Sequence, residues 1–302
     1  MRDEELSRTG SGRQPHSANL GATSSPLLSV TVAVPVKNEG ANLAACLSRL
    51  SRFGEIVVID SGSTDGTQQI ARQFGARVVD FAWNGKYPKK RNWFLLNAPP
   101  KTPWVLFLDA DELVDEAFCD ALASAVADSN IQGYWLTYTN YFLGKPLRHG
   151  LGQRKLALFR VGRALYERID EDSWSGLDME IHEHPIVEGP VGEISTPIDH
   201  HDDRGIDKFV SRHREYALWE ARRYRVLQED KDAWARFTRR QRFKYSHLAR
   251  WWYPWFYFLF TYVVKGGFLD GGPGFHYAFY KTWYFQTIRL LIREQASSRI
   301  SQ

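Results

Sequence analysis

The segment WVLFLDAD, residues 104–111, is a run of five apolar residues closed by two aspartates, Asp109 and Asp111. Five apolar residues in succession are typical of a strand that is buried on both faces, as the inner strands of a parallel sheet are. Ligands bind such sheets in the crevice beyond the carboxyl ends of the strands, where both aspartates lie. The segment therefore predicts a parallel sheet with a polar site at its edge.

Strand and helix patterns alternate on both sides of this segment. Further apolar runs predict strands at residues 28–34, 55–60 and 76–79. Helical patterns are found at residues 41–50, 67–74, 89–97 and 115–127. This alternation predicts an α/β fold with a mostly parallel, Rossmann-like sheet and helices on both faces. Later segments predict short strands and then long polar helices, at residues 134–142, 155–160, 205–225 and 231–250.

Composition excludes several classes of protein. The chain has 302 residues, enough for one domain of about 200 residues and a sizeable appendage. Its two cysteines, Cys46 and Cys119, lie far apart in predicted helices. This spacing excludes a disulfide framework and a cysteine metal site, and it predicts two buried thiols in a reducing cytosol. Residues 1–26 lack the apolar core of a signal peptide and predict a disordered tail rich in Ser, Gly and Arg.

Asp109 and Asp111 also suggest a metal site. Two carboxylates two positions apart at the exit of a strand are suited to a hard divalent cation such as Mg²⁺ or Mn²⁺. A cation there would neutralise a diphosphate as it departs. The pattern alone is also compatible with helix capping, and its position after a buried strand favours the metal.

Asp60 ends another predicted buried strand and is followed by the turn Ser61-Gly62-Ser63-Thr64-Asp65-Gly66. Asp65 or Thr64 is expected to cap the next helix. The Asp60 carboxylate could accept hydrogen bonds from the N–H of a base such as uracil. Turn formation and ligand binding are compatible at this position.

Three segments share their order and spacing with a known family: VAVPVKNE at 32–39, VVIDSGSTDGT at 57–67 and FLDADE at 107–112. They resemble the family two glycosyltransferases, which have the GT-A fold, over roughly residues 28–130. A looser resemblance to the lipopolysaccharide-core branch of that family extends toward the end of the chain. It rests on IHEH at 181–184 and VVKGGFLDG at 263–271.

The resemblance implies a nucleoside-diphosphate-sugar donor, with a UDP-sugar favoured, and a saccharide acceptor. Asp109 would face the ribose and the metal, and Asp111 would bind the metal directly. Ser61 departs from the family, because many members carry a second aspartate there. The other residues expected along the donor are Pro35, Glu39, Asp60 and Arg91.

Inverting sugar transfer needs a base that takes the proton of the acceptor hydroxyl. The best candidate is Glu183, with His182 and His184 on either side to tune its pKa or reach the metal. The alternative is a strand edge with solvated side chains. Asp178 and Glu180 are the substitutes for Glu183.

The cluster Asp199-His200-His201-Asp202-Asp203 offers a further metal or diphosphate ligand. His200 is the predicted ligand, since imidazole commonly binds metals. The alternative is that the cluster starts the helix near Gly205, with Asp203 as its N-cap.

The last hundred residues are basic and then aromatic. Residues 204–250 hold 14 Lys and Arg against 6 Asp and Glu, and residues 251–285 hold 17 of the 43 aromatic residues. The apolar run to Val264 is too short to cross a bilayer, but Trp and Tyr prefer membrane interfaces and basic residues attract anionic lipid. We therefore predict that residues 236–293 anchor the protein on the inner face of the cytoplasmic membrane.

Two alternatives to the anchor remain. The aromatic residues could pack the last helices onto the catalytic domain. Basic residues interleaved with aromatics can also bind nucleic acid, but no recognised nucleic-acid motif accompanies them, so no nucleic-acid partner is expected.

The predicted organisation has a disordered tail (1–26), a GT-A catalytic domain (27–203) and a helical, membrane-associating extension (204–302). The catalytic domain divides into a nucleotide-binding half (27–130) and an acceptor-binding half (131–203). The expected function is a metal-dependent, inverting glycosyltransferase that acts on a lipopolysaccharide-core, lipid-linked or other cell-surface saccharide. One alternative is a sugar nucleotidyltransferase, for which residues 36–40 fit poorly, and the other is a non-catalytic membrane-bound scaffold.

Overall fold

The apolar, β-branched residues of β1 (Leu28–Val36) form the strand around which the sheet is assembled. The computed structural model describes residues 27–171, 174–180, 183–202, 205–230, 234 and 237–300. In it, β1 lies parallel to β2 (Phe53–Asp60) on one side and to β4 (Trp104–Phe107) on the other. β3 (Arg77–Asp80) continues the parallel part beyond β2.

The sheet then becomes mixed, in the order β3-β2-β1-β4-β8-β6-β11-β5. β8 is antiparallel to both β4 and β6, whereas β11 is parallel to β6. The strands of this part, with the β9–β10 pair that forms a second sheet, are β5 (Glu112–Leu113), β6 (Gly133–Phe142), β7 (Lys145–Leu147), β8 (Gln153–Arg160), β9 (Ala164–Tyr166), β10 (Pro185–Val187) and β11 (Val191–His201). The predicted α/β fold is confirmed.

Helices cover both faces of the parallel part, as predicted. Alternate residues of a strand face opposite sides of the sheet. Val32 and Val34 accordingly pack in the core layer that includes residues of α1, α2 and α4, whereas Ala33 packs in the layer that includes Phe94 of α3. The bounds of these helices are α1 (Gly40–Leu47), α2 (Thr67–Gln73), α3 (Lys90–Asn97) and α4 (Glu116–Val126). Cys46 and Cys119 are buried free thiols, as expected.

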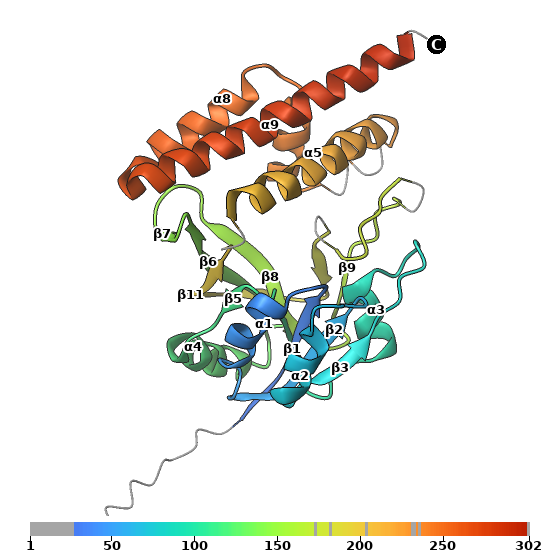
Figure 1. Cartoon of the computed structure of the whole chain (residues 1–302), viewed down its shortest axis with the longest axis vertical. Coiled ribbons are helices and arrows are strands. Elements are labelled where there is room, and N and C mark those ends of the chain that lie inside the picture. Colours follow the sequence, from blue (N-terminus) through green and yellow to red (C-terminus); the bar gives the residue numbers. More distant parts are fainter. Residues whose placement is uncertain are drawn as a thin grey trace, which may run out of the picture.

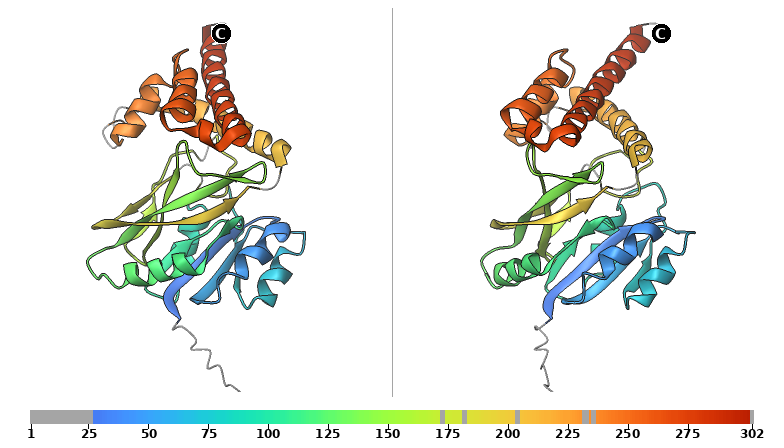
Figure 2. Two further views of the ribbon diagram at one scale, coloured as in Figure 1. Left: turned by 90° about the vertical axis from the view of Figure 1, so that its left-hand side faces the viewer. Right: turned by 60° about the vertical axis from the view of Figure 1, so that its left-hand side comes forward.

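The C-terminal part is helical, and its helices lie together beyond the carboxyl ends of the parallel strands (Figure 1). Figure 2 shows this helical part and the sheet from two further sides. The elements are α5 (Gly205–Glu229), α7 (Arg239–His247), α8 (Tyr253–Phe258), the π-helix η1 (Leu259–Val264), the 3₁₀-helix η2 (Gly267–Asp270) and α9 (Gly271–Ile300). No helix among the described residues is long and apolar enough to cross a bilayer.

One predicted helix differs from the structure. The pattern at 231–250 suggested one continuous helix, but within the described residues α7 begins only at Arg239. Thr238 and Gln241 form a capping box there, in which each side chain accepts a bond from the other residue's backbone N–H. A capping box starts a new helix because it satisfies amides that have no partner in the first turn.

Aromatic side chains join the extension to the sheet. Phe142 at the end of β6 makes edge contacts with Phe209 of α5 and with Tyr277 of α9, at ring-centroid distances of 5.2 and 5.5 Å. The extension also has a core of its own, which includes Tyr245, Tyr284 and Phe285. Part of the aromatic content therefore packs in the interior, as the alternative to the anchor expected.

Candidate active site

Asp109, the first residue of the site, is held by two cations. Its Oδ1 lies 3.0 Å from Arg91 Nη2 and its Oδ2 lies 2.8 Å from Lys155 Nζ. Burial alone would raise the pKa of this carboxyl, but Lys155 and Arg91 outweigh it and hold the pKa below its usual range. Asp109 is therefore ionised at neutral pH.

Lys155 serves a second carboxylate. Its ammonium group also contacts Glu112, whose Oε2 accepts a bond of 3.1 Å from the Asp109 backbone N–H. Burial raises the pKa of Glu112 despite that contact. Sequence reasoning missed Lys155, whose only signal is a charged residue at the start of the buried run 156–159.

Asp111 lies beside His200, and both were predicted as metal ligands. His200 Nε2 lies 3.6 Å from Asp111 Oδ1, and its Nδ1 lies 2.8 Å from Asn140 Oδ1. The strands bring them together, since His200 pairs with Glu112 of β5 and with Asn140 of β6. Burial would lower the pKa of His200, but the hydrogen bond with Asp111 outweighs it and raises the pKa. We call the six residues around Asp109 the Asp109 cluster: Arg91, Asp109, Asp111, Glu112, Lys155 and His200.

The side chains of this cluster can be compared with the ligands that a divalent cation requires. Among the described residues, no group of three or more His, Cys, Asp or Glu is arranged to hold a metal. The two carboxylate oxygens of Asp109 each contact a cationic side chain. Asp111 and His200 are therefore the pair of this cluster that could bind a metal. Mg²⁺-type ions typically use one or two protein carboxylates and take their other ligands from water and substrate phosphates. The pair fits a cation whose coordination a diphosphate would complete.

Asp60 organises the loop that follows β2. The side chain is fully buried, and its carboxylate accepts bonds from Gly62 N (3.1 Å), Ser63 N (2.9 Å) and Gln68 Nε2 (2.7 Å). Asp65 accepts a bond from the N–H of Thr67 at the start of α2, although Gly66 holds the N-cap position. Contact between Asp60 and a base stays a prediction, and it requires Gln68 or Ser63 to move.

Pro35 and Glu39 lie beside this loop. Pro35 is a buried residue of β1 that pairs with Ile59 of β2. Glu39 is the N-cap residue of α1, and its backbone N–H donates to Thr67 Oγ1 at 3.0 Å. Both residues are therefore at the carboxyl edge of the sheet, and their contacts with a nucleotide stay predictions.

Arg91 connects α3 to the chain near residue 180. Glu180 caps the helix, because its carboxylate accepts bonds from the backbone N–H of Arg91 (2.8 Å) and Asn92 (3.0 Å). The Arg91 guanidinium donates to the Glu180 carbonyl and to Asp109. Glu180, named as a substitute base, is thus a cap, and the other substitute, Asp178, accepts a bond of 2.6 Å from Ser61 Oγ.

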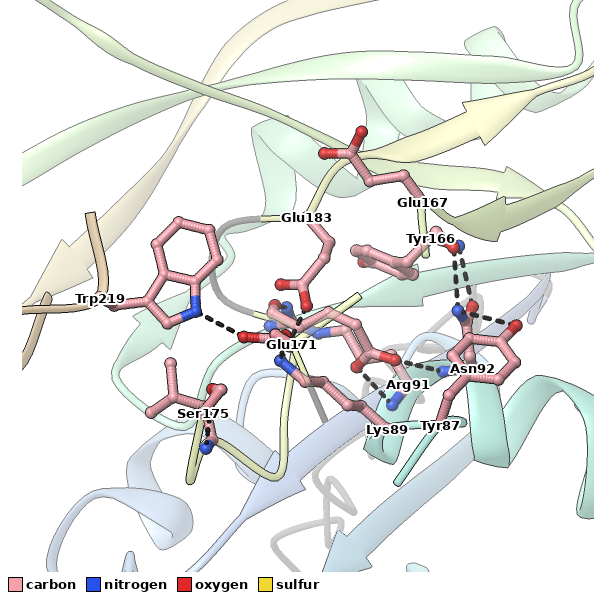
Figure 3. A network of polar contacts seen from close by, with 12 residues as sticks. Tyr87, Lys89, Arg91, Asn92, Tyr166, Glu167, Glu171, Ser175, Glu183 and Trp219 are labelled. Carbon is pink, nitrogen blue, oxygen red and sulfur yellow. Dashed lines mark hydrogen bonds and ion pairs between the residues drawn. The ribbon is translucent and has the colours of Figure 1, made fainter. Parts of the chain in front are cut away.

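Glu183 belongs to a second cluster of buried charge (Figure 3). Its Oε1 lies 2.8 Å from Lys89 Nζ, and Lys89 also contacts Glu171. Trp219 of α5 donates a bond of 2.5 Å from Nε1 to Glu171 Oε2. We call Lys89, Glu171, Glu183 and Trp219 the Glu183 cluster. Lys89, Glu171 and Trp219 were not found from the sequence, because they come from distant segments.

The environment of Glu183 favours its protonated form. Burial and a hydrogen bond with Glu171 raise its pKa, and Lys89 opposes them without reversing the direction. The sequence had assigned this tuning to the neighbouring histidines. His184 has a pKa lowered by burial, and His182 lies outside the described residues, as does Asp203. The cavity beside Glu183 is about 10 Å³, about the volume that one water needs.

Comparison with known proteins identifies the domain. Residues 31–175 match the model of glycosyl transferase family 2. This segment is a family 2 domain. The chain is 31% identical over 179 residues to the lipopolysaccharide core biosynthesis glycosyltransferase LpsC of Rhizobium meliloti. The matched segment covers 57% of this chain and 62% of LpsC.

The family 2 domain has other relatives. An uncharacterized glycosyltransferase of Rickettsia felis is 24% identical over 250 residues, which covers 80% of this chain and 83% of the relative. The glucosyl-3-phosphoglycerate synthase of Mycobacterium tuberculosis, solved in complex with Mn²⁺, UDP and glucosyl-3-phosphoglycerate, is 26% identical. That match covers 38% of this chain and 44% of the solved one, with a TM-score of 0.29.

Proposed function

We propose that the protein is an inverting glycosyltransferase that uses a nucleoside-diphosphate sugar, with a UDP-sugar favoured. The observation that carries the proposal is the Asp111–His200 pair, set beside an Asp109 that is held ionised at the carboxyl edge of the sheet. Nucleotide ligands bind at such edges. The proposal divides the chain into a nucleotide-binding half (27–130), an acceptor-binding half (131–203) and an extension (204–302).

The proposed reaction is a direct displacement. The acceptor hydroxyl attacks the anomeric carbon from the face opposite the diphosphate, so its oxygen forms the new bond while the bond to the diphosphate breaks. Asp111 and His200 would hold a divalent cation, which when bound would offset the charge of the diphosphate. Arg91 and Lys155 place two further cations next to Asp109.

Glu183 is the proposed base. Its raised pKa supports this role, because proton transfer is most effective when the pKa of the base lies near the working pH. To accept the proton of an acceptor, Glu183 would have to exchange its contact with Lys89 for one with the acceptor hydroxyl. The proposed acceptor is a lipopolysaccharide-core or lipid-linked saccharide, and the similarity to LpsC supports it.

Calorimetric binding of UDP, GDP, ADP, CMP and dTDP, each with and without Mn²⁺, tests the donor site. We expect metal-dependent binding of one nucleotide by the wild type and its loss in Asp111→Ala. Asp120→Ala is the matched control, because Asp120 is a carboxylate on the surface of α4 with 71% of its side chain exposed. Absence of nucleotide binding under every condition would overturn the proposal and favour the non-catalytic scaffold.

We further propose that the extension docks on an anionic membrane surface at the cytoplasmic leaflet. The segment 251–264 exposes large apolar side chains, among them Trp251 (69%) just before α8, Trp255 (59%) of α8 and Leu259 (57%) of η1. Apolar patches of this kind on a soluble domain mark interaction sites. Arg250 and Lys265 are exposed just before Trp251 and just after η1, and Trp with basic residues suits an anionic interface.

Flotation with anionic phosphatidylglycerol vesicles tests this docking. We expect the wild type to float with the vesicles, and Trp251→Ser combined with Trp255→Ser to stay at the bottom of the gradient. Leu96→Ser on α3 is the control, since Leu96 is equally apolar and 53% exposed but lies in the catalytic domain. A wild type that never floats would end the membrane proposal and leave the donor proposal untouched.

A further inference from the structure

We infer that the cavity between β6 and the C-terminal segment 261–277 is the acceptor-saccharide site, in which the Tyr138 hydroxyl hydrogen-bonds the sugar. The inference rests on the proposed glycosyltransferase function. It also gives a role to GGFLDGG at 266–272, a motif that the donor chemistry does not use.

The cavity has a volume of about 250 Å³ and walls from two parts of the molecule. Tyr138 and Asn140 of β6 form one wall, and Asp270 and Tyr277 of the extension form the other. On the measure in which one water needs about 10–15 Å³, this volume holds many waters. It is large enough for a sugar ring and far larger than the cavity beside Glu183.

The wall between these two parts is a loop pinned by Asp270. The Asp270 carboxylate accepts bonds from Arg148 N (3.2 Å), His149 N (2.9 Å) and His149 Nδ1 (2.9 Å). Gly150 N donates to Lys265 O at 3.0 Å. Four bonds thus hold residues 148–150 against the extension, so the cavity has a defined shape before any ligand enters.

Gly267 of the motif and Gly274, two residues after it, let the chain pack tightly here. A Cβ on Gly274 would lie 2.1 Å from Gly267 O, and a Cβ on Gly267 would lie 2.9 Å from Thr261 O. Both contacts are with backbone atoms, which cannot move aside as a flexible side chain can. The start of α9 therefore packs directly on η1 and η2, and this close packing brings Asp270 and Tyr277 to the cavity.

Tyr138 provides the observation that points to a ligand. The residue is only 6% exposed, yet within the part of the chain that the structure describes its hydroxyl has no hydrogen-bond partner. Buried tyrosine hydroxyls usually have one, and leaving such a group without a partner costs about 1–3 kcal/mol. Tyr138 lines the cavity but its hydroxyl oxygen is itself buried, so a hydroxyl group of a bound sugar can supply the missing partner once the tyrosine side chain turns toward the cavity.

The cavity adjoins the proposed donor site on two sides. Asn140, a lining residue, bonds His200, which contacts Asp111. The Tyr138 ring lies 5.0 Å from Lys155 Nζ, which bonds Asp109. A sugar in the cavity would therefore lie beside the Asp109 cluster. Glu183 is not among the lining residues, so the reacting hydroxyl would have to extend out of the cavity to reach the proposed base.

Tyr138→Phe tests the inference, with core oligosaccharide released from lipopolysaccharide by mild acid as the probe. Tyr141→Phe is the matched control, because Tyr141 is a neighbour on β6 that stacks on His201 instead of lining the cavity. We expect the Tyr138 variant to bind the oligosaccharide about tenfold more weakly, the loss of roughly one hydrogen bond. Its nucleotide affinity should match the wild type, and its stability without ligand should be equal or higher, because the variant no longer buries an unpartnered hydroxyl.

A second variant, Gly152→Phe, places a bulky side chain at a residue that lines the cavity. A Cβ at Gly152 meets no atom within 4 Å, so the backbone tolerates the side chain. We expect nucleotide binding to persist and oligosaccharide binding to disappear. If nucleotide binds but both variants hold the oligosaccharide as tightly as the wild type, the acceptor assignment is wrong while the proposed function stands. If no nucleotide binds to the wild type, the proposed function itself fails.

Discussion

The Asp109 cluster and the Glu183 cluster lie on either side of the start of α3, and they differ in how many cations serve each acid. Asp109 has two, Arg91 and Lys155. Glu171 and Glu183 share Lys89. The pKa of Asp109 is consequently lowered and that of Glu183 raised. Asp109 in the first cluster is ionised at neutral pH, whereas Glu183 in the second binds its proton more tightly than an ordinary glutamate. Acid–base chemistry uses such pairs of groups whose pKa values are pushed apart.

A single basic segment, KKRN at 89–92, supplies cations to both clusters. Lys89 precedes α3 in an extended conformation and reaches Glu171 and Glu183. Arg91 lies in the first turn and reaches Asp109. Lys90 points to a third place, where its Nζ bonds Val36 O at 3.2 Å. The beginning of the helix thus distributes adjacent positive charges among different acids.

Replacement of Glu183 should produce the largest effect. If Glu183 is the base, Glu183→Gln removes general-base catalysis, which contributes about 10²–10⁴-fold to a rate, so kcat should fall by that order. The acid limb of the wild-type pH–rate profile should lie above the usual Glu range, because the base must be ionised and its pKa is raised. That limb should be absent from the variant. Sugar transfer assayed from pH 4 to 9 measures both effects.

Glu167→Gln is the control for that experiment, since Glu167 lines the same small cavity as Glu183. Its turnover should stay within about threefold of the wild type, the scatter expected for a residue outside the chemistry. Near-normal turnover of Glu183→Gln would show that the cluster is structural and that the base lies elsewhere.

Lys155→Met should have the next largest effect, on stability. Removing one partner of a buried pair costs about 3–5 kcal/mol, and since 31% of Lys155 is exposed we expect about 2–4 kcal/mol at pH 7. In the wild type the lowered pKa of Asp109 contributes stability above its unfolded pKa, which is lost as pH falls. The variant lacks that contribution, so its deficit should shrink toward acid pH.

Urea unfolding at pH 7 and pH 4 measures this difference. Arg154→Met is the matched control, because Arg154 is the preceding cation on β8 but pairs on the surface with Glu193, both about half exposed. Such pairs contribute little, so its stability should change by less than about 1 kcal/mol. An equal effect of the two substitutions would mean that Lys155 is not a buried counterion.

Sequence patterns predicted the Asp109 cluster much better than the Glu183 cluster. Asp109 and Asp111 follow a buried strand directly, and His200, predicted as a further metal or diphosphate ligand, lies 3.6 Å from Asp111. Metal binding by these residues stays a prediction. Strand periodicity reveals which residues end a strand, but it does not reveal which strands are neighbours. Lys155 reaches Asp109 only because β8 pairs with β4, a neighbour relation that local patterns do not encode.

The Glu183 cluster could not be assembled from local patterns at all. Its members come from the segment before α3, two loops and α5, and tertiary packing alone brings Lys89 and Glu171 to Glu183. The sequence therefore singled out Glu183 by its polar neighbourhood, but it could not reveal that Glu171 and Lys89 act on its pKa. The same limit applies to Tyr138, whose hydroxyl is exceptional only because no partner reaches it.

Trp219→Phe should give the smallest effect and would sharpen the comparison most. Trp219 is the contribution of the extension to the Glu183 cluster, through its 2.5 Å bond to Glu171. Loss of a bond to a charged group costs about 1.5–3 kcal/mol, and we expect the lower end because Lys89 still contacts Glu171. Urea unfolding measures this loss. Trp174→Phe is the control, because the Trp174 ring packs against Trp219 at 5.7 Å and, among the described contacts, Trp174 bonds Glu171 only through its backbone N–H, which the substitution keeps.

The same variant should change the pH dependence in a defined direction. The bond from Trp219 lowers the pKa of Glu171, so its removal makes Glu171 a better competitor for the proton. Glu183 then ionises at lower pH, and the acid limb of the pH–rate profile should move toward acid. A loss of stability with an unmoved acid limb would show that Trp219 only fastens the extension. A moved limb would mean that the extension also sets the proton affinity of the proposed base, because the two carboxylates share one cation and their proton affinities are linked.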